Sequence, residues 1–539
     1  MLTPEPRALS TEASSLQIEL EESSARSDSP LEQSSLLDKV LAKDRLSIAS
    51  GERRFSTADG SSARTPLDDF SSSRDFATLL CLWFGREQIE RCLYRNPKWI
   101  ADQLDRDIAR IDALVEKQLN NILHAKPFQK LEASWRGAKY LVETREEHPD
   151  ARIAIRILNV SWGELKQDFE GALEFDQSQL FRKVYEEGLG QPGADPFSCL
   201  IADYSIHPRL TSNYRYDDMH ILQGLSSVAA AAFCPLIANA HPSMMSVDRF
   251  SDLRNGLDVQ NLHSSLDFLA WRGFRATEDS RFVSLAMPHI LMRRPYRDET
   301  DHGFPFNERV VEIDDYLWGG AAFAMGEVLI RSFAESGWFS NIRGAQRGVV
   351  GGGLVIGPAQ DPFNTEPHQN AVRTITDVSF ADSFERELSA AGFLPLCACK
   401  DVPMAAFYSS TTAQVQKSYD TLEATMSAKL STMLNYILCV SRFGHFLKVI
   451  ARQKIGSCNT PGELQDVLQT WITNYVAPDP EASASTRLKK PLLEADIQVH
   501  EIPGRPGEYE SIFHLVPHHE LDDMKVSIRL DTKLLPQRS

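Results

Sequence analysis

The most constraining feature of the sequence is a helical pattern between Leu422 and Ile455. Apolar side chains recur there at helical spacing over more than one face, as Leu430, Phe443 and Ile450 illustrate. A helix that is apolar on several faces must be surrounded by other elements, because a surface helix keeps a polar side toward water. The pattern therefore predicts a strong helical stretch over 422–455, and a chain of 539 residues is long enough to bury a large core.

Helical and strand patterns both occur upstream of that helix. A long amphipathic helix is expected between Pro97 and His124, and a second helix over 128–143. Alternating or short apolar runs then predict strands at 153–160, 199–206 and 282–287. Because segments of both kinds follow one another along the chain, we expect a mixed α/β fold.

Further elements are expected in the second half of the chain. Residues 222–232 are predicted to form a helix of small residues, and 317–333 a buried helix in which Glu327 is the exception. After a linker at 477–490, the tail alternates like a set of strands. A strand at a chain end can pair with the sheet of a neighbouring chain, and an ordinary local hairpin is the alternative.

The composition limits the class of protein. The chain has 57 Lys and Arg against 74 Asp and Glu, and the net charge of −17 argues against a general nucleic-acid binder. Its eight cysteines are too sparse for a disulfide scaffold and favour a reducing compartment. The chain start lacks a signal-peptide pattern, and no apolar run reaches the ~20 residues of a membrane span. We therefore expect a cytoplasmic protein without direct membrane insertion.

The N-terminal segment differs from the rest in composition. Residues 1–35 are rich in serine and acidic residues and lack aromatic residues, which predicts disorder. A short amphipathic helix is expected directly after them, where Ser35 and Asp38 resemble a capping box. A second Ser-rich and Gly-rich linker isolates this helix at 47–73. Such an isolated apolar helix is either a docking peptide for a partner or a helix that folds back onto the core.

The chain carries no recognisable catalytic, cofactor-binding or metal-binding motif. Patterns for a P-loop, a zinc protease, a hydrolase nucleophile elbow and an EF-hand are absent. The glycine run 351–353 lacks the strand and helix context of a phosphate loop, and Cys397 and Cys399 lack a second cysteine pair for zinc. The histidine group at 514–519 is expected to be an ordinary loop feature. We therefore expect no enzyme and no cofactor.

A series of short blocks points to one family, and they run in order from about residue 100 to the end of the chain. The blocks are Ile111–His124, Phe128–Gly137, Val228–Pro235, Leu317–Gly319, Phe333–Trp338, Ile342–Gly344, Gly351–Gly353, Ser441–Ile450, Pro503–Gly507 and Pro517–Asp522. Together they resemble the large subunit of the contractile sheath of bacterial type VI secretion systems, the TssC family, also called VipB or ImpC/EvpB.

This resemblance implies a structural, non-enzymatic role. Members of the family pair with a small sheath subunit, TssB (VipA), and the heterodimers polymerise around a tube of Hcp protein above a baseplate. Contraction of the sheath drives the tube and its effectors out of the cell, and the AAA+ ATPase ClpV then disassembles the contracted sheath. The implied partners are therefore the small subunit, other sheath heterodimers, the Hcp tube, the baseplate and ClpV.

The resemblance also assigns roles to two segments. The family's ClpV signal lies on an N-terminal helix with a Leu-Leu-Asp start. The matching candidate recognition residues are Leu36, Leu37, Asp38, Val40 and Leu41. The C-terminal strand corresponds to the strand that family members exchange between subunits, which implies inter-subunit roles for Val526, Ile528 and Leu530.

The sequence and the resemblance together predict four regions in a mixed α/β sheath subunit. These are a disordered acidic tail (1–35), a helical N-terminal region with a linker for small-subunit and ATPase docking (36–99), an α/β middle domain (100–315) and a C-terminal sheath core domain with terminal β-strands (316–539). Residues 60–100 depart from the family pattern. Because of this departure, the first alternative is that the chain is a divergent, ImpD-like paralogue, which regulates or caps the sheath without polymerising. The second alternative is that the chain is not a structural protein but an enzyme whose catalytic residues are dispersed along the sequence.

Overall fold

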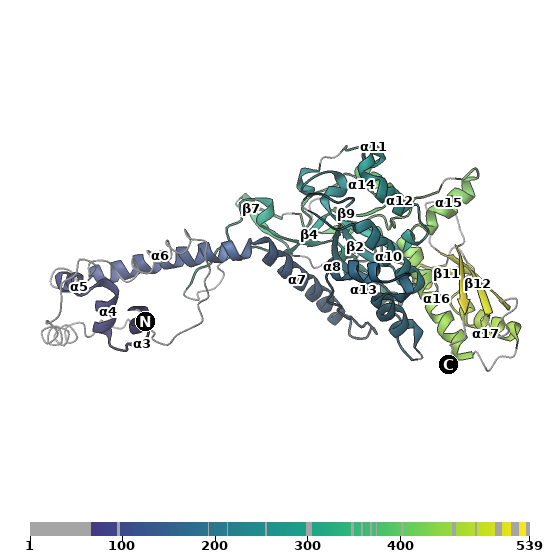
Figure 1. The fold of residues 1–539 in the computed structure, drawn as a ribbon, viewed down its shortest axis with the longest axis horizontal. Helices are drawn as coiled ribbons and strands as arrows, with labels where there is room; N and C mark the ends of the chain where they lie inside the picture. Colours follow the sequence, from purple (N-terminus) through teal and green to yellow (C-terminus); the bar gives the residue numbers. More distant parts are fainter. Residues whose placement is uncertain are drawn as a thin grey trace. The chain divides into compact units, whose positions relative to one another are not determined.

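The computed structural model describes most of the chain from residue 66 onward (Figure 1). The described ranges are 66–93, 98–191, 193–212, 214–253, 256–297, 304–345, 350–356, 359–366, 369–372, 374–399, 404–417, 419–454, 460–479, 482–501, 509–518 and 528–534. The chain divides into two compact units. The first contains residues 1–120 and 298–306, and the second contains residues 121–297 and 307–539.

The first unit is helical where it is described. Its helices are α3 (Pro66–Ser72), α4 (Phe76–Phe84), α5 (Arg86–Leu93) and the long α6 (Lys98–Leu123), whose last turn reaches the second unit. Asp75 caps α4 by accepting a hydrogen bond from the Thr78 N–H at 2.9 Å. Gly85 then turns the chain into α5 with a φ of 82°, a backbone conformation that glycine adopts without strain.

A small apolar cluster holds the first unit together. Its buried members come from α4 and α5, and its partly buried members come from α4 and the first turns of α6. They are Leu80, Phe84 and Ile89, packed against Cys81, Trp83, Trp99, Ile100 and Leu104. The Trp83 indole N–H donates to the buried Asp107 carboxylate at 3.0 Å, which supplies a partner for a polar group on this packed face of α6.

A six-stranded sheet forms the centre of the second unit. In sheet order its strands are β1 (Leu200–Ile206), β2 (Leu236–Ala240), β3 (Val283–Met287), β9 (Phe393–Ala398), β10 (Ala405–Phe407) and β6 (Leu354–Val355). The first four strands are parallel to their neighbours, and the last two pairings are antiparallel. Every residue of β2 and β3 is buried, which is typical of parallel strands covered on both faces.

Helices cover both faces of this sheet (Figure 1). On one face, Leu236 and Ala238 of β2 pack in a core cluster with α8 (Trp162–Gly171), α10 (Asp218–Ala231), α11 (Val259–Ser264), α12 (Leu269–Arg275) and α14 (Asp382–Ala390). On the other face, Ile237 packs with α13 (Ala322–Ser336). Helix α7 (Lys126–Glu146) lies outside α13, where Leu141 contacts Phe323 in a cluster of its own. The alternation along β2 follows from the two-residue period of a strand.

Shorter elements connect these layers. Two antiparallel pairs are formed by β4 (His289–Arg293) with β5 (Leu317–Gly320) and by β7 (Pro362–Glu366) with β8 (Gln369–Val372). The short helices are α9 (Gln179–Phe181), a π-helix (Arg182–Gly190) and 3-10 turns at Phe175–Gln177, Pro242–Met245, Phe250–Asp252, Leu266–Phe268, Asp279–Phe282 and Ile313–Asp315. Among the described residues, no helix combines the length and the hydrophobicity needed to cross a membrane.

The C-terminal part of the second unit packs four helices with a three-stranded sheet. The helices are α15 (Leu422–Ser431), α16 (Leu434–Lys454), α17 (Pro461–Thr473) and α18 (Ala484–Lys489). The antiparallel sheet has the order β11 (Leu492–Glu501), β12 (Tyr509–Pro517) and β13 (Ile528–Leu534). Leu464 and Leu468 of α17 pack against Ile497 and Phe513 of the sheet.

The predicted α/β fold is confirmed, and three of the predicted elements are corrected. The expected helix over 422–455 is broken between α15 and α16, where Met433 forms a bridge with Thr411. The first residues of the expected helix over 317–333 form β5, because a glycine pair at its end allows a tight pairing with β4. The expected strand at 153–160 forms no ladder at all.

Candidate functional site

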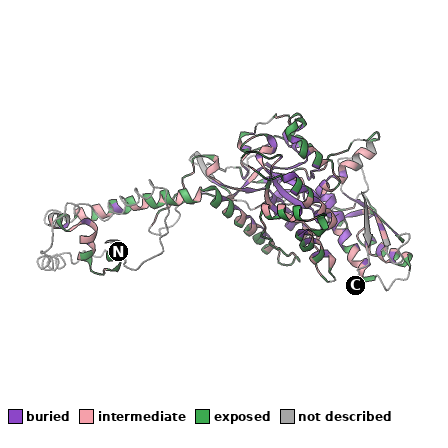
Figure 2. Cartoon of the chain, viewed as in Figure 1, coloured by how far each residue is buried: buried purple, intermediate pink, exposed green. Residues whose placement is uncertain are grey.

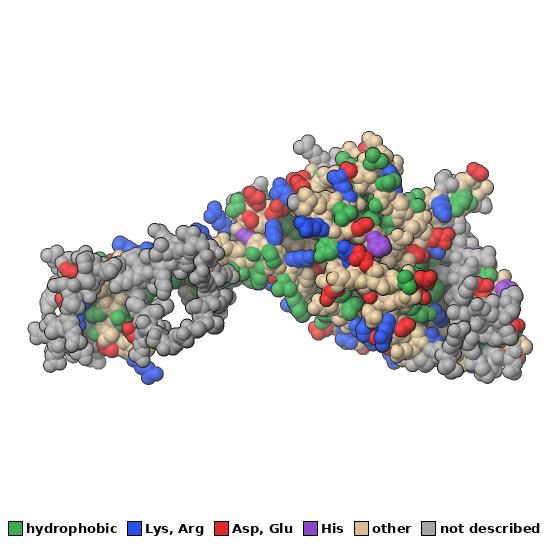
Figure 3. Space-filling view, in the orientation of Figure 1, with side chains coloured by type: hydrophobic (Ala, Val, Ile, Leu, Met, Phe, Trp, Pro, Cys, Tyr) green, Lys and Arg blue, Asp and Glu red, His purple; other side chains and the backbone are tan. Residues whose placement is uncertain are grey.

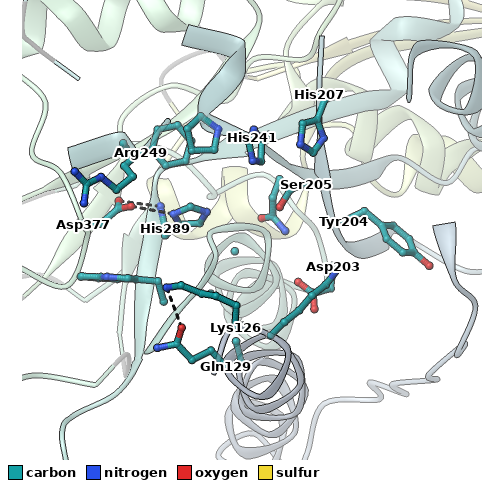
Figure 4. A pocket seen from close by; sticks show the side chains of 18 of the residues that line it. Lys126, Gln129, Asp203, Tyr204, Ser205, His207, His241, Arg249, His289 and Asp377 are labelled. Atoms are coloured by element: carbon teal, nitrogen blue, oxygen red, sulfur yellow. Dashed lines mark hydrogen bonds and ion pairs between the residues drawn. The ribbon is translucent and has the colours of Figure 1, made fainter. Parts of the chain in front are cut away.

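A cavity of the second unit opens at the carboxyl ends of the parallel strands β1 and β2 (Figure 4). It has a volume of about 870 Å³, and Asp203, Ser205 and His207 line it from β1 and the residue after it. Asn239 and His241 come from the end of β2. Ligands of open α/β sheets usually bind outside the carboxyl ends of the strands, so this is the place to test for chemistry.

Three histidines line this cavity, and two of them are stacked. The His207 ring lies between Tyr214 and His241, with ring centroids 3.7 Å and 3.8 Å away. The third histidine, His289, bonds through Nδ1 to Asp377 at 2.9 Å (Figure 4). Burial and the neighbouring His207 and His289 lower the pKa of His241 to about 4, so His241 is neutral at pH 7.

The carboxylate of Asp218 lies beside the stack and accepts hydrogen bonds from three neighbouring residues. Asp218 is buried and accepts hydrogen bonds from the Trp162 indole N–H at 2.7 Å, the Tyr214 hydroxyl at 2.7 Å and the His207 backbone N–H at 2.8 Å. Burial raises the pKa of Tyr214, and its hydrogen bond to the Asp218 carboxylate raises it further. A carboxylate that accepts hydrogen bonds from three neighbouring groups fixes their orientation.

The hydrogen bonds around His241 indicate helix capping. Nδ1 of His241 lies 2.8 Å from the Ser243 hydroxyl and accepts from the Ser243 backbone N–H at 3.2 Å, at the start of a 3-10 turn. A nucleophile also needs a base that a third group orients, and no described carboxylate bonds to His241. Across the described ranges, no three His, Cys, Asp or Glu side chains group closely enough to hold a metal ion.

The glycine run has a packing role in the described structure. The Gly353 N–H donates to the Gly344 carbonyl at 2.7 Å, and the Phe407 N–H donates to the Gly353 carbonyl at 2.9 Å. A Cβ atom on Gly353 would lie 2.2 Å from the Phe407 oxygen, which is too close for any side chain. Glycine is needed here because two backbone segments approach closely.

The predicted site residues fall partly outside the described residues. This applies to Leu36, Leu37, Asp38, Val40 and Leu41, the candidate ClpV signal, and also to Val526. Ile528 and Leu530 lie in β13, whose backbone pairs with β12 of the same chain, opposite Leu515 and Phe513. The exchange of this strand between subunits therefore stays a prediction.

Uncovered apolar side chains are a second kind of candidate site. On α6, Ile108 is 52% exposed and Val115 is 40% exposed. On α7, Leu131 is 57% exposed and Trp135 is 67% exposed, and hydrophobic side chains gather over this helix in Figure 3. Contiguous exposed apolar surface of this kind marks interaction sites. The helical periodicity predicted both helices. It did not predict that the described residues leave these apolar side chains exposed.

Comparison with known protein families identifies two sheath domains in the sequence. Residues 105–414 match the family described as EvpB/VC_A0108, tail sheath N-terminal domain, and residues 423–534 match its gpW/gp25-like domain. The chain is also 38% identical over 435 residues to the type VI secretion system sheath protein TssC1 of Pseudomonas aeruginosa, a match that covers 79% of this chain and 85% of that protein. The chain therefore belongs to the EvpB/VipB family of type VI secretion sheath proteins.

Proposed function

We propose that this chain is the structural large subunit of a type VI secretion contractile sheath. In this role it pairs with the small sheath subunit TssB, polymerises around the Hcp tube on a baseplate in the cytoplasm, and drives effector delivery by contraction. The observation that carries the proposal is the match of both sheath domains, which together span most of the chain from residue 105 to 534. The proposed role is non-enzymatic.

The uncovered face of α6 supports the pairing with a small subunit. Ile108, Leu114 and Val115 are each at least 40% exposed and recur on a helix of 26 residues. Burying one such side chain completely contributes about 1.5–3 kcal/mol. A helix of the partner that packs along this face would therefore supply a stable contact by helix packing.

The C-terminal sheet supports the proposed linkage between subunits. β13 is an edge strand that pairs with β12 over the register Tyr509↔Leu534 to Leu515↔Ile528. An edge strand can be exchanged with an identical strand of a neighbour, because the same backbone bonds form in both arrangements. Such strand exchange would keep subunits connected while their bodies rotate during contraction.

The assembly itself tests the proposal. We expect co-expression of this chain with its small subunit to give tubules with a cogwheel cross-section in electron micrographs. A heterodimer that stays soluble under assembling conditions would instead support the non-polymerising paralogue. Since the net charge is −17, unlike-charged faces must meet in the polymer, so tubule yield should also depend on salt.

The candidate ATPase signal requires its own experiment. We expect Leu37→Asp combined with Val40→Asp to leave tubule assembly intact and to weaken ClpV binding at least tenfold, because apolar side chains supply most of the affinity of such a helix. Ser47→Asp in the adjoining linker is the matched control. Unchanged ClpV binding to the double variant would refute the assignment.

A further inference from the structure

Residues 153–160 connect helices on opposite faces of the central sheet. α7 packs on the α13 face, where Leu141 contacts Phe323, and α8 packs on the α10 face, where Phe169 lies against Gly224. β1 is the end strand of the sheet, and among the described residues no strand pairs with its outer edge. The connecting segment therefore passes around an open sheet edge.

This segment has the sequence of a strand without the bonds of one. It reads Ile-Ala-Ile-Arg-Ile-Leu-Asn-Val, a composition rich in β-branched residues. Within the described structure, the backbone N–H and C=O groups of 154–159 form no hydrogen bond. Ile157 is 69% exposed and Leu158 is 55% exposed. Such a conflict between local preference and observed pairing indicates a missing ladder partner.

Both ends of the segment are anchored. The Arg145 guanidinium donates to the Ile153 carbonyl at 3.3 Å. The Tyr204 hydroxyl, from β1, donates to the Val160 carbonyl at 2.5 Å. Between these points, the Arg156 guanidinium lies 5.5 Å from the centre of the Phe197 ring, just before β1. The fixed ends hold the unpaired middle beside the open edge, which limits the entropy lost when a strand binds.

The chain itself indicates which strand could bind there. Its own β13 pairs with β12 along seven residues, and no described strand of this chain pairs with 153–160. From 151 to 160 the charged side chains are Arg152 and Arg156, both exposed, with no acidic residue among them. A complementary strand is therefore extended, apolar at alternate positions, and carries a carboxylate to face these arginines.

We propose that residues 153–160 are the acceptor site for an acidic, apolar β-strand of the small sheath subunit. This inference rests on the proposed function, because it assigns one contact of the proposed heterodimer. It differs from the docking on α6, since here backbone hydrogen bonds supply the contact and side chains set the register.

Hydrogen–deuterium exchange on the purified heterodimer tests the site directly. We expect the alternate amides of 154–159 that face the bound strand to exchange roughly 100-fold more slowly than in an unstructured peptide of the same sequence. If the wild-type chains form no heterodimer, the proposed function fails as a whole. If they form one and these amides stay unprotected, only the acceptor site is overturned. Protection that appears in the polymer but not in the heterodimer also overturns it, because the bound strand then comes from a neighbouring heterodimer.

Two proline variants test the ladder in the same complex. Consecutive N–H groups of a strand point to opposite edges, so Ile157→Pro and Leu158→Pro remove donors from different edges. We expect one of them to reduce co-purified small subunit by about tenfold. Neither N–H has a hydrogen-bond partner among the described residues, so the fold of this chain should tolerate both changes. Ile157→Thr keeps the N–H and the β-branch and is the matched control. Wild-type co-purification in both proline variants would overturn the proposal.

Discussion

Helices α6 and α16 are both long and both carry apolar residues in every turn, yet the second unit buries α16 almost completely. From Leu434 to Leu447 nearly every residue of α16 is buried, and this includes the polar Asn435 and His445. On α6 the one buried residue is Asp107, and Figure 2 shows the helix as mainly exposed and intermediate. The amount of apolar surface therefore does not decide burial. Burial is decided by whether the same chain supplies covering elements, and for α6 the proposed small subunit would supply them.

The largest expected effect lies in the covered helix. Phe443 is fully buried, and its ring stacks on Trp338 with centroids 4.4 Å apart. Phe443→Ala should lower the free energy of unfolding by about 3–5 kcal/mol, because it removes contacts and leaves a cavity. Phe446→Ala on the same helix is the control, since Phe446 is 38% exposed and should cost about 1 kcal/mol. Urea unfolding of the heterodimer measures both, and equal losses would contradict the comparison.

The uncovered helix should respond in binding and not in stability. Ile108→Asp combined with Val115→Asp places charges on the open face of α6, where folding should change by no more than ~0.5 kcal/mol each. We expect co-purified small subunit to fall at least tenfold, which corresponds to about 1.4 kcal/mol. Leu173→Asp is a matched control, because Leu173 is 92% exposed and lies outside α6. Full co-purification of the double variant would show that this face is not an interface.

Buried histidines give the covered region a pH dependence. Burial is the main cause that lowers the pKa values of His241, His263 and His445 to about 4, from an ordinary 6.5. The folded chain keeps them neutral while the unfolded chain takes up protons below pH 6.5. The free energy of unfolding should therefore fall as the pH drops from 6.5 to 4.

His445 on α16 allows this pH dependence to be assigned. Its Nε2 lies 2.7 Å from the Ala232 carbonyl, so the neutral ring serves as the donor. His445→Gln retains a donor and cannot titrate, so the acid-side slope of the thermal midpoint, Tm, should become shallower in the variant. Identical slopes in the variant and the wild type would exclude a contribution from His445.

A buried acid on α13 gives the opposite pH dependence. Burial raises the pKa of Glu327 to about 8 from 4.5, although Arg331 opposes this by bonding to the carboxylate at 2.7 Å. Between about pH 4.5 and 8 the unfolded chain loses a proton that the folded chain keeps, so this group costs stability as the pH rises. Glu327→Gln does not titrate. The Tm of the Glu327→Gln variant relative to that of the wild type should therefore increase from pH 5 to pH 8. A constant difference between the two Tm values over this pH range would contradict the prediction.

Much of the fold could be predicted from periodicity, and the errors have physical causes. The strand predicted at 282–287 is β3 within one residue, because a short buried apolar run ending before Pro288 leaves few alternatives. The break between α15 and α16 was missed, since Thr432 and Met433 leave the helix for contacts with Thr411 and Thr412 that are distant in sequence. Local propensity cannot represent such contacts.

The candidate sites were less predictable than the fold. The stack of His207, Tyr214 and His241 has no sequence signal, because its members come from separate segments that only the parallel sheet brings together. The residues 153–160 do have the sequence of a strand, but no described strand pairs with them. A single sequence can show that a segment prefers a strand, and it cannot show whether the partner strand belongs to the same molecule.

The sequence by itself determined the α/β class, the helices with their apolar faces, and the ordered blocks that resemble the sheath family. These follow from local periodicity and from residue identity, which need no knowledge of distant contacts. The tertiary structure decided which apolar faces the chain covers and which remain open. It buried α16 between the core of the central sheet and the C-terminal cluster of α17 with the three-stranded sheet. It left the faces of α6, α7 and the 153–160 segment without a described covering element. The physical reason is that burial depends on every element packed around a face, so it is a property of the assembled molecule.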